Sequence, residues 1–119
     1  MNIPVTPELS SQVIETLAAL LECGYKLVTF ERYARYLAVE KKGFVALLES
    51  SGGKLKMFGQ VGYRMGDGIG MLVERREGKI FVCHGESVAA THELLAAYER
   101  VKAELARLIE RGAAKSRKQ

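Results

Sequence analysis

The chain has 119 residues, of which 48% are hydrophobic and 27% are charged, and it contains two prolines and no tryptophan. A chain of this length forms one domain, and its apolar share is too high for a disordered protein. The composition also excludes collagen-like, disulfide-scaffold and membrane-spanning classes, because no apolar run approaches the ~18 residues that cross a bilayer. It selects no function.

Charge is unevenly distributed along the sequence. There are 18 basic and 14 acidic residues, which gives a formal net charge of +4. The excess positive charge lies in residues 25–85 and at the C-terminal end, which holds Lys115, Arg117 and Lys118. A surface of this kind attracts anions in general. Because acidic residues interrupt the basic ones throughout, it falls short of the dense basic footprint typical of nucleic-acid-binding domains.

Cysteine usage and the first residues bear on the cellular compartment. Cys23 and Cys83 are the two cysteines, fewer than a disulfide-dependent secreted domain of this size usually has. The first seven residues contain both prolines and carry no basic-then-apolar secretion signal. We therefore expect a cytoplasmic protein. Asn2 and Asp67 are the sole Asn and Asp, whereas Glu is abundant, a bias that favours a thermophilic source.

The first predicted element is a helix at about residues 7–23. Thr6 is a fair N-cap, Pro7 suits the first helical position, and Gly24 is a natural stop. Apolar residues between these signals recur at the helical period. They are Leu9, Val13, Ile14, Leu17, Leu20 and Leu21.

The middle of the chain, from Tyr25 to Cys83, is rich in β-branched and aromatic residues, and its glycines recur at short intervals. We expect an extended stretch at 25–40 that bends near Arg32 and Tyr33. Further strands are predicted at 44–49, 55–60, 69–75 and 80–83. Short glycine turns between such strands predict an antiparallel meander, because a parallel sheet would need crossover helices for which there is no room.

After residue 91 the sequence returns to the helical period, with apolar spacings of 4, 3, 4 and 3 from Leu94 to Leu108. Gly112 is expected to end this helix, and residues 113–119 are expected to form a basic, disordered tail. The predicted fold is an α+β domain over residues 1–112. It is an antiparallel meander sheet of about five strands flanked by N-terminal and C-terminal helices.

Several predicted strands are apolar on both faces. A sheet covered by helices on one side leaves its other face to water, so such strands should alternate with polar residues. Either one helix covers each face or a second copy covers the open one, and a two-fold dimer is the commonest solution. We therefore expect a small non-enzymatic domain that acts through protein association, as a homodimer. The expected interface residues are Val45, Leu47, Leu72 and Phe81.

A group of basic and aromatic residues supports a second hypothesis, which is nucleic-acid binding. Aromatic rings on a basic sheet stack on bases while cations contact phosphates. Alternation along a strand divides the group between the two faces of the sheet, unless the bend near residues 32–33 reorients it. The candidate residues are Arg32, Tyr33, Arg35, Tyr36, Lys54, Lys56, Tyr63 and Arg64, together with Phe58.

A third hypothesis is a small-ligand binder or enzyme with a pocket under the glycine-rich segment 59–70. Gly66, Gly68 and Gly70 do not fit a dinucleotide fingerprint, because a strand rather than a helix follows them. A hairpin turn with bulges explains them instead, and a mobile flap over a ligand is the alternative.

The first residues to test under this third hypothesis are a cysteine and a histidine. Cys83 could be a nucleophile with His92 as its base, although no third residue orients the imidazole. Cys23, Cys83, His84 and His92 lack the close ligand pairs typical of a zinc site. We therefore assign no catalytic residue, no metal and no cofactor, and we expect no membrane partner.

Overall fold

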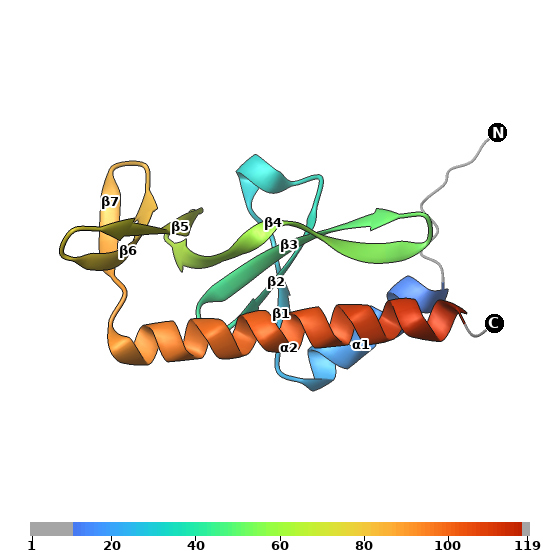
Figure 1. The fold of residues 1–119 in the computed structure, drawn as a ribbon. Coiled ribbons are helices and arrows are strands. Elements are labelled where there is room, and N and C mark those ends of the chain that lie inside the picture. The colour runs from blue at the N-terminus through green and yellow to red at the C-terminus, as the bar shows by residue number, and fades with distance from the viewer. Residues whose placement is uncertain (1–10, 118–119) are drawn as a thin grey trace.

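A computed structural model gives the structure of residues 11–117 (Figure 1). One helix precedes the strands in the sequence and one follows them: α1 at Ser11–Glu22 and α2 at His92–Arg117. A short 3-10 helix, η1, occupies Glu31–Tyr33 between the first two strands. The strands are β1 (Lys26–Val28), β2 (Leu37–Lys41), β3 (Phe44–Ser51), β4 (Lys54–Met65), β5 (Gly68–Arg75), β6 (Gly78–Cys83) and β7 (Glu86–Ala89).

The strands form one antiparallel meander in which each strand pairs with its neighbour in sequence, so the predicted α+β fold class is confirmed. The sheet has seven strands, and the prediction of about five is wrong. The expected stretch at 25–40 is two strands, because η1 interrupts it. β7 escaped prediction because its side chains are mostly exposed, so it lacks an apolar alternation.

The helix boundaries differ from the prediction at the C-terminal end. The predicted helix at 7–23 is confirmed over Ser11–Glu22, whereas residues 7–10, with Thr6 and its expected cap, lie outside the described residues. The prediction that Gly112 ends the second helix is wrong, because α2 continues to Arg117. An interior glycine costs about 1 kcal/mol relative to alanine, and the two alanines that follow it are the best helix formers.

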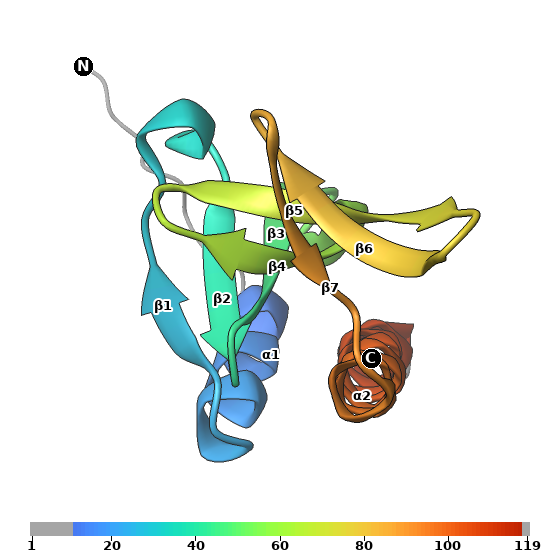
Figure 2. The same cartoon turned by 90° about the vertical axis from the view of Figure 1, so that its left-hand side faces the viewer.

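Both helices lie on the same face of the sheet (Figures 1 and 2), and the core on that face joins them to the strands. Four aromatic rings form its centre: Phe44 of β3, Tyr63 of β4, Phe81 of β6 and Tyr98 of α2. Ring centroids in this group lie 5.2–6.2 Å apart. The cluster therefore fastens both halves of the sheet to the first turns of α2.

A second, smaller core covers the opposite face of the sheet. The segment between β1 and β2 folds over this face and contributes Phe30, Tyr33 and Tyr36. These side chains pack with Ala38, Val45, Leu47 and Ile69 from the strands and with Val28. Consecutive residues of β3, from Phe44 to Leu48, are all buried, because each face of this strand has its own cover.

This second core corrects the expectation that one face of the sheet is left to water. Val45, Leu47 and Phe81 are 1%, 7% and 0% exposed within the single chain, and Leu72 packs against the helix-side core. Residues 29–36 cover this face within the single chain, so the burial of these side chains gives no reason to expect a second copy there.

Replacing Phe81 with alanine should lower the free energy of unfolding by about 3–5 kcal/mol, the usual cost of emptying the site of a buried phenyl ring. Urea unfolding at two protein concentrations tests this. The loss should be the same at both, because the ring is buried by its own chain. A loss below about 1 kcal/mol, or one that vanishes on dilution, would contradict this placement.

Candidate functional site

The strand β4 has one edge that is open for part of its length. β3 pairs with β4 from Lys54 to Tyr63, whereas β5 pairs with its last residues, Tyr63–Met65. Within residues 11–117, no strand pairs with the side of Lys54–Val61 that faces away from β3. We call this side the open edge. Figure 1 shows why the edge is open. The β3–β4 hairpin extends towards the C-terminal end of α2, whereas β5, β6 and β7 lie over the N-terminal end of that helix.

The turn before β4 decides which backbone groups lie on the open edge. Gly52 and Gly53 have φ of 62° and 79°, the signs of a two-residue type I′ hairpin, which places a hydrogen-bonded pair at Ser51 and Lys54. Hydrogen-bonded pairs then alternate along an antiparallel ladder. The amides and carbonyls of Leu55 and Met57 therefore point outward, away from β3.

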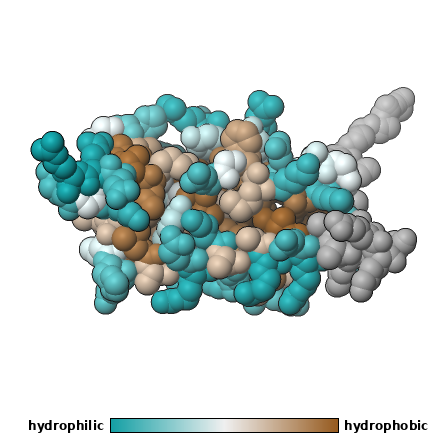
Figure 3. All heavy atoms as spheres, in the orientation of Figure 1, coloured by the Kyte–Doolittle hydropathy of each residue, from teal (hydrophilic) through white to brown (hydrophobic). Residues whose placement is uncertain are grey.

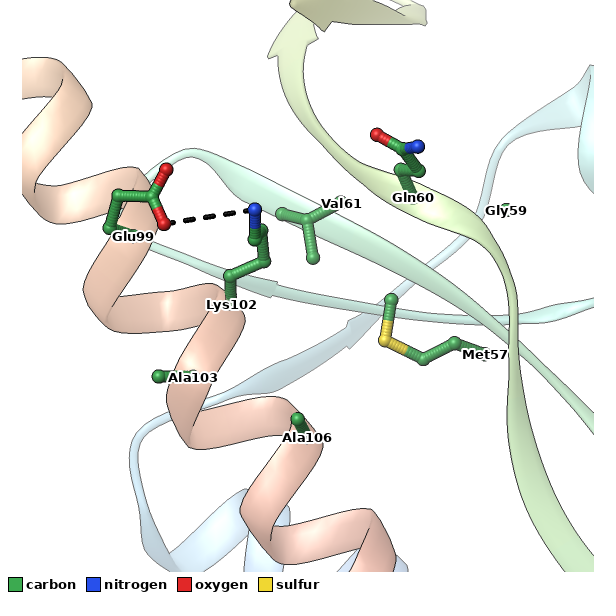
Figure 4. A pocket seen from close by; sticks show the side chains of 8 residues that line it. All are labelled: Met57, Gly59, Gln60, Val61, Glu99, Lys102, Ala103 and Ala106. Atoms are coloured by element: carbon green, nitrogen blue, oxygen red, sulfur yellow. Dashed lines mark ion pairs between the residues drawn. The ribbon is translucent and has the colours of Figure 1, made fainter.

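A groove of about 480 Å³ runs beside this edge, between β4 and α2. We call it the β4–α2 groove. Figure 4 shows the side chains of Met57 and Lys102 extending into the space, whereas that of Gln60 points away. The lining residues are Met57, Gly59, Gln60 and Val61 of β4 and Glu99, Lys102, Ala103 and Ala106 of α2.

The groove exists because β4 bulges and because α2 is lined with small side chains at this point. Between the pairs Val45–Gly62 and Leu47–Phe58 the register shifts, and Gly59 adopts a φ of 74° that favours glycine. Ala103 and Ala106 do not fill the space that this bulge leaves. Figure 3 shows apolar surface between the strands and α2, bordered by hydrophilic side chains.

Part of the predicted basic and aromatic group gathers on the face of the sheet opposite the helices. The rings of Tyr36 and Phe58 stack at 4.3 Å, and the Arg35 guanidinium lies 5.5 Å from the Tyr36 ring. Lys54 and Lys56 share the face of Phe58 through the strand alternation. We call these five residues the outer basic face.

The other predicted residues of that group lie elsewhere. Tyr63 belongs to the helix-side core, and Tyr33 packs against the second core. Arg64 donates to the Glu40 carboxylate at 2.8 Å. Arg32 lines a separate pocket, so the eight predicted residues do not form one surface.

The pocket that Arg32 lines has a volume of about 380 Å³ and lies beside the end of the glycine-rich segment, whereas Gly59 at its start lines the β4–α2 groove. Cys83 and His84 line it together with the Met65–Gly68 turn and Glu86. A Cβ atom added at Gly68 would lie 2.6 Å from the Cys83 sulfur, so only glycine lets the turn approach this thiol. His84, in a turn with φ of 49°, takes the place expected for His92, which is not among the lining residues.

This pocket lacks the arrangement that a nucleophilic thiol needs. Among the described residues, no hydrogen bond joins Cys83 to His84 or to Asp67. No group of three or more His, Cys, Asp or Glu residues in this part of the chain could hold a metal ion. The described residues of this pocket therefore do not form the hydrogen-bonded pair of nucleophile and base that thiol catalysis needs.

A fourth feature, which the sequence analysis did not find, is a polar network that joins α2 to β2 and to Tyr25, the residue before β1. The Glu104 carboxylate accepts hydrogen bonds at 2.8 Å from the Lys41 ammonium and from the Tyr25 hydroxyl. The bond from Lys41 is the main cause that lowers the pKa of Glu104 below its ordinary value of 4.5. Burial, helped by the bond to Glu104, raises the pKa of Tyr25, which stays neutral.

The comparisons with known proteins add no relative to this description. Protein-family models give no match to the chain, and searches of curated proteins and of solved structures give none either. Among the described residues, no helix is long and apolar enough to cross a membrane. The function has to be inferred from the residues of this chain.

Replacing Glu104 with glutamine should lower the free energy of unfolding by about 1 kcal/mol at pH 7, because a charged acceptor of two hydrogen bonds is lost. The folded pKa of Glu104 is lowered, so its contribution is present above pH 4.5 and is lost as the pH falls through the folded pKa. Urea unfolding from pH 7 to pH 3 should show the two proteins converging. A difference that stays constant over this range would contradict the assignment.

Proposed function

We propose that this domain associates with another protein by adding an extended segment of that partner to the open edge of β4. The supporting observation is the coincidence of unpaired backbone groups with an apolar groove of about 480 Å³ along the same strand. Strand addition of this kind uses main-chain hydrogen bonds for affinity and pockets for alternate side chains for specificity.

The backbone supports an antiparallel added strand. The outward amides of Leu55 and Met57 would donate two hydrogen bonds to it, and their carbonyls would accept two from it. Each bond contributes about 0.5–1.5 kcal/mol net, so these bonds alone give modest affinity and the side chains must supply the rest.

The two sides of the added strand would meet different surroundings. On the helix side, its side chains would enter the β4–α2 groove beside Met57, Ala103 and Ala106, where medium-sized apolar groups fit. On the other side, they would lie next to Lys54 and Lys56, which favours acidic residues. The expected partner segment therefore alternates apolar and acidic residues.

A second copy of this chain matches the open edge less well than such a segment does. Its own β4 carries lysines at the same two positions and so offers no acidic complement, and lysines and bulges are common protections of an edge strand against self-pairing. A two-fold axis at this edge would also bring both α2 helices to one side of the joined sheet. The homodimer stays a prediction, now without support from Val45, Leu47 and Phe81, which are buried.

Binding of a fluorescein-labelled peptide of eight residues that alternate valine and glutamate tests the proposal by anisotropy. Met57→Pro removes the outward amide donor without removing a ladder bond to β3, and Met57→Leu is the matched control that keeps the donor. We expect the proline variant to bind about two- to tenfold more weakly than the leucine variant, the loss that corresponds to one main-chain hydrogen bond. Ala106→Leu, which fills the groove from the helix side, should weaken binding by a similar factor.

Three outcomes would contradict this proposal. The first is equal binding by the proline and leucine variants while circular dichroism shows both folded. The second is equal binding of a peptide in which lysine replaces glutamate. The third is light scattering that shows a dimer which Met57→Pro converts to a monomer, because the occupant of the open edge would then be a second copy.

Nucleic-acid binding at the outer basic face is a second candidate, favoured by the stacked pair of Tyr36 and Phe58 with Arg35 over it. Phe58 is 42% exposed, so one side of this stack faces solvent and could receive a base. The neighbouring Lys54 and Lys56 would contact phosphates.

Anisotropy with a labelled single-stranded oligonucleotide at low salt tests this second candidate. Arg35→Glu and Lys56→Glu should each weaken binding and lower the slope of log affinity against log salt by about 1. Lys79→Glu on β6 is a control, since this exposed residue lies outside the outer basic face. Absence of binding at low salt, or equal effects of all three variants, would contradict nucleic-acid recognition here.

A further inference from the structure

A basic recess lies on the flank of α2 opposite the β4–α2 groove. Its volume is about 210 Å³, and its walls come from the β2–β3 turn and from one side of the helix. Four of its lining residues are cationic and one is acidic. The lining residues are Lys41, Lys42, Ala97, Arg100, Val101, Glu104 and Arg107.

The single carboxylate in this recess is already engaged. Glu104 accepts hydrogen bonds from the Lys41 ammonium and the Tyr25 hydroxyl, both at 2.8 Å. Lys42, Arg100 and Arg107 make no ion pair with an acidic group within the described residues. Arg107 is near enough to Glu104 to help lower the pKa of that carboxyl, but four cations face one carboxylate, so the recess keeps an excess of positive charge.

The network beneath the recess holds one of the cations in place. Lys41 lies between the Glu104 carboxylate and the Tyr25 ring, whose centroid is 5.0 Å from the ammonium. A lysine ammonium has three donors, so the bond to Glu104 leaves others for a ligand in the recess. Tyr25 is itself buried, and this anchors the network to the helix-side core.

The backbone at the rim adds a second observation. Lys42 has a φ of 55° and Gly43 a φ of 88°, as in a type I′ turn, where asparagine and glycine are the usual first residues. A lysine in the left-handed region is strained, and strained residues cluster at ligand sites. Here the strained position is the one that brings an ammonium to the rim of the recess.

We propose that the basic recess binds a small anion that carries phosphate groups. Two guanidinium groups can donate to phosphate oxygens in pairs, and the two ammonium groups add point charges. The volume is about seven times the ~30 Å³ share of one water in the liquid, which suits a pyrophosphate-sized group. This binding is independent of strand addition at the open edge, because the two surfaces lie on opposite flanks of α2.

Calorimetric titration of the full-length protein with pyrophosphate, at constant ionic strength set by sodium chloride, tests this inference. We expect saturable binding that Arg100→Gln and Arg107→Gln each weaken by about tenfold, the effect of losing one charge-assisted hydrogen bond. Lys42→Asn should weaken binding by a similar factor while keeping or raising the thermal midpoint, since asparagine suits the turn. Lys102→Gln, on the other flank of α2, is the matched control and should change binding less than twofold.

Three results would overturn the inference: no saturable binding, equal weakening by Lys102→Gln, or the same heat from chloride alone. A phosphate-bearing oligonucleotide titrated in parallel separates the two sources of phosphate. Oligonucleotide binding that is lost in Arg35→Glu but kept in Arg107→Gln belongs to the outer basic face, whereas pyrophosphate binding with that same dependence on Arg35 would overturn the inference. Met57→Pro should leave pyrophosphate binding unchanged, which separates failure of this inference from failure of the proposed strand addition.

Discussion

The unequal pairing of the two edges of β4 is the constraint on which the remaining architecture depends. One edge pairs with β3 on both sides of a bulge, from Lys54 to Phe58 and again at Gly62 and Tyr63, whereas the other edge pairs with β5 only at Tyr63–Met65. The strands form two groups, the β3–β4 hairpin and the strands β5–β7, which diverge at the bulge in β4. Because they diverge, they can cover α2 along its length, which a flat sheet could not do. The same divergence leaves the open edge. The β4–α2 groove is therefore a consequence of how the sheet curves and is no accident of surface side chains.

The aromatic cluster makes this geometry stable. Phe44 and Phe81 come from the two strand groups, and Tyr98 comes from α2, so their contacts join three parts of the fold around Tyr63. Edge-on and tilted ring pairs contribute about 0.5–1.5 kcal/mol each beyond the burial of their area. The divergence of the strand groups occurs next to this cluster, which limits how far they can separate.

Sequence reasoning predicted the element types well, because hydrophobic period and glycine turns are local signals. It failed where burial depends on distant segments. Residues 29–36 have no regular period, yet Phe30 and Tyr36 close the second face of the sheet. The expectation that a partner protein covers Val45 and Leu47 follows from leaving this segment out of the core. The outer basic face was predicted only in part, because the path of this loop and the register of β4 decide which cations share a face with Phe58.

Helix α2 illustrates the same limit for the candidate sites. Its period shows at once that Tyr98, Val101 and Leu105 face the core, and the structure agrees. The period also separates two flanks, one with Ala103 and Ala106 and one with Arg100 and Arg107. What each flank does depends on its neighbour: alanines form a groove only beside an unpaired strand, and arginines form an anion site only beside a lysine-bearing turn. Neither neighbour is visible from the helix, so function in this fold arises from contacts between elements rather than from any motif within one.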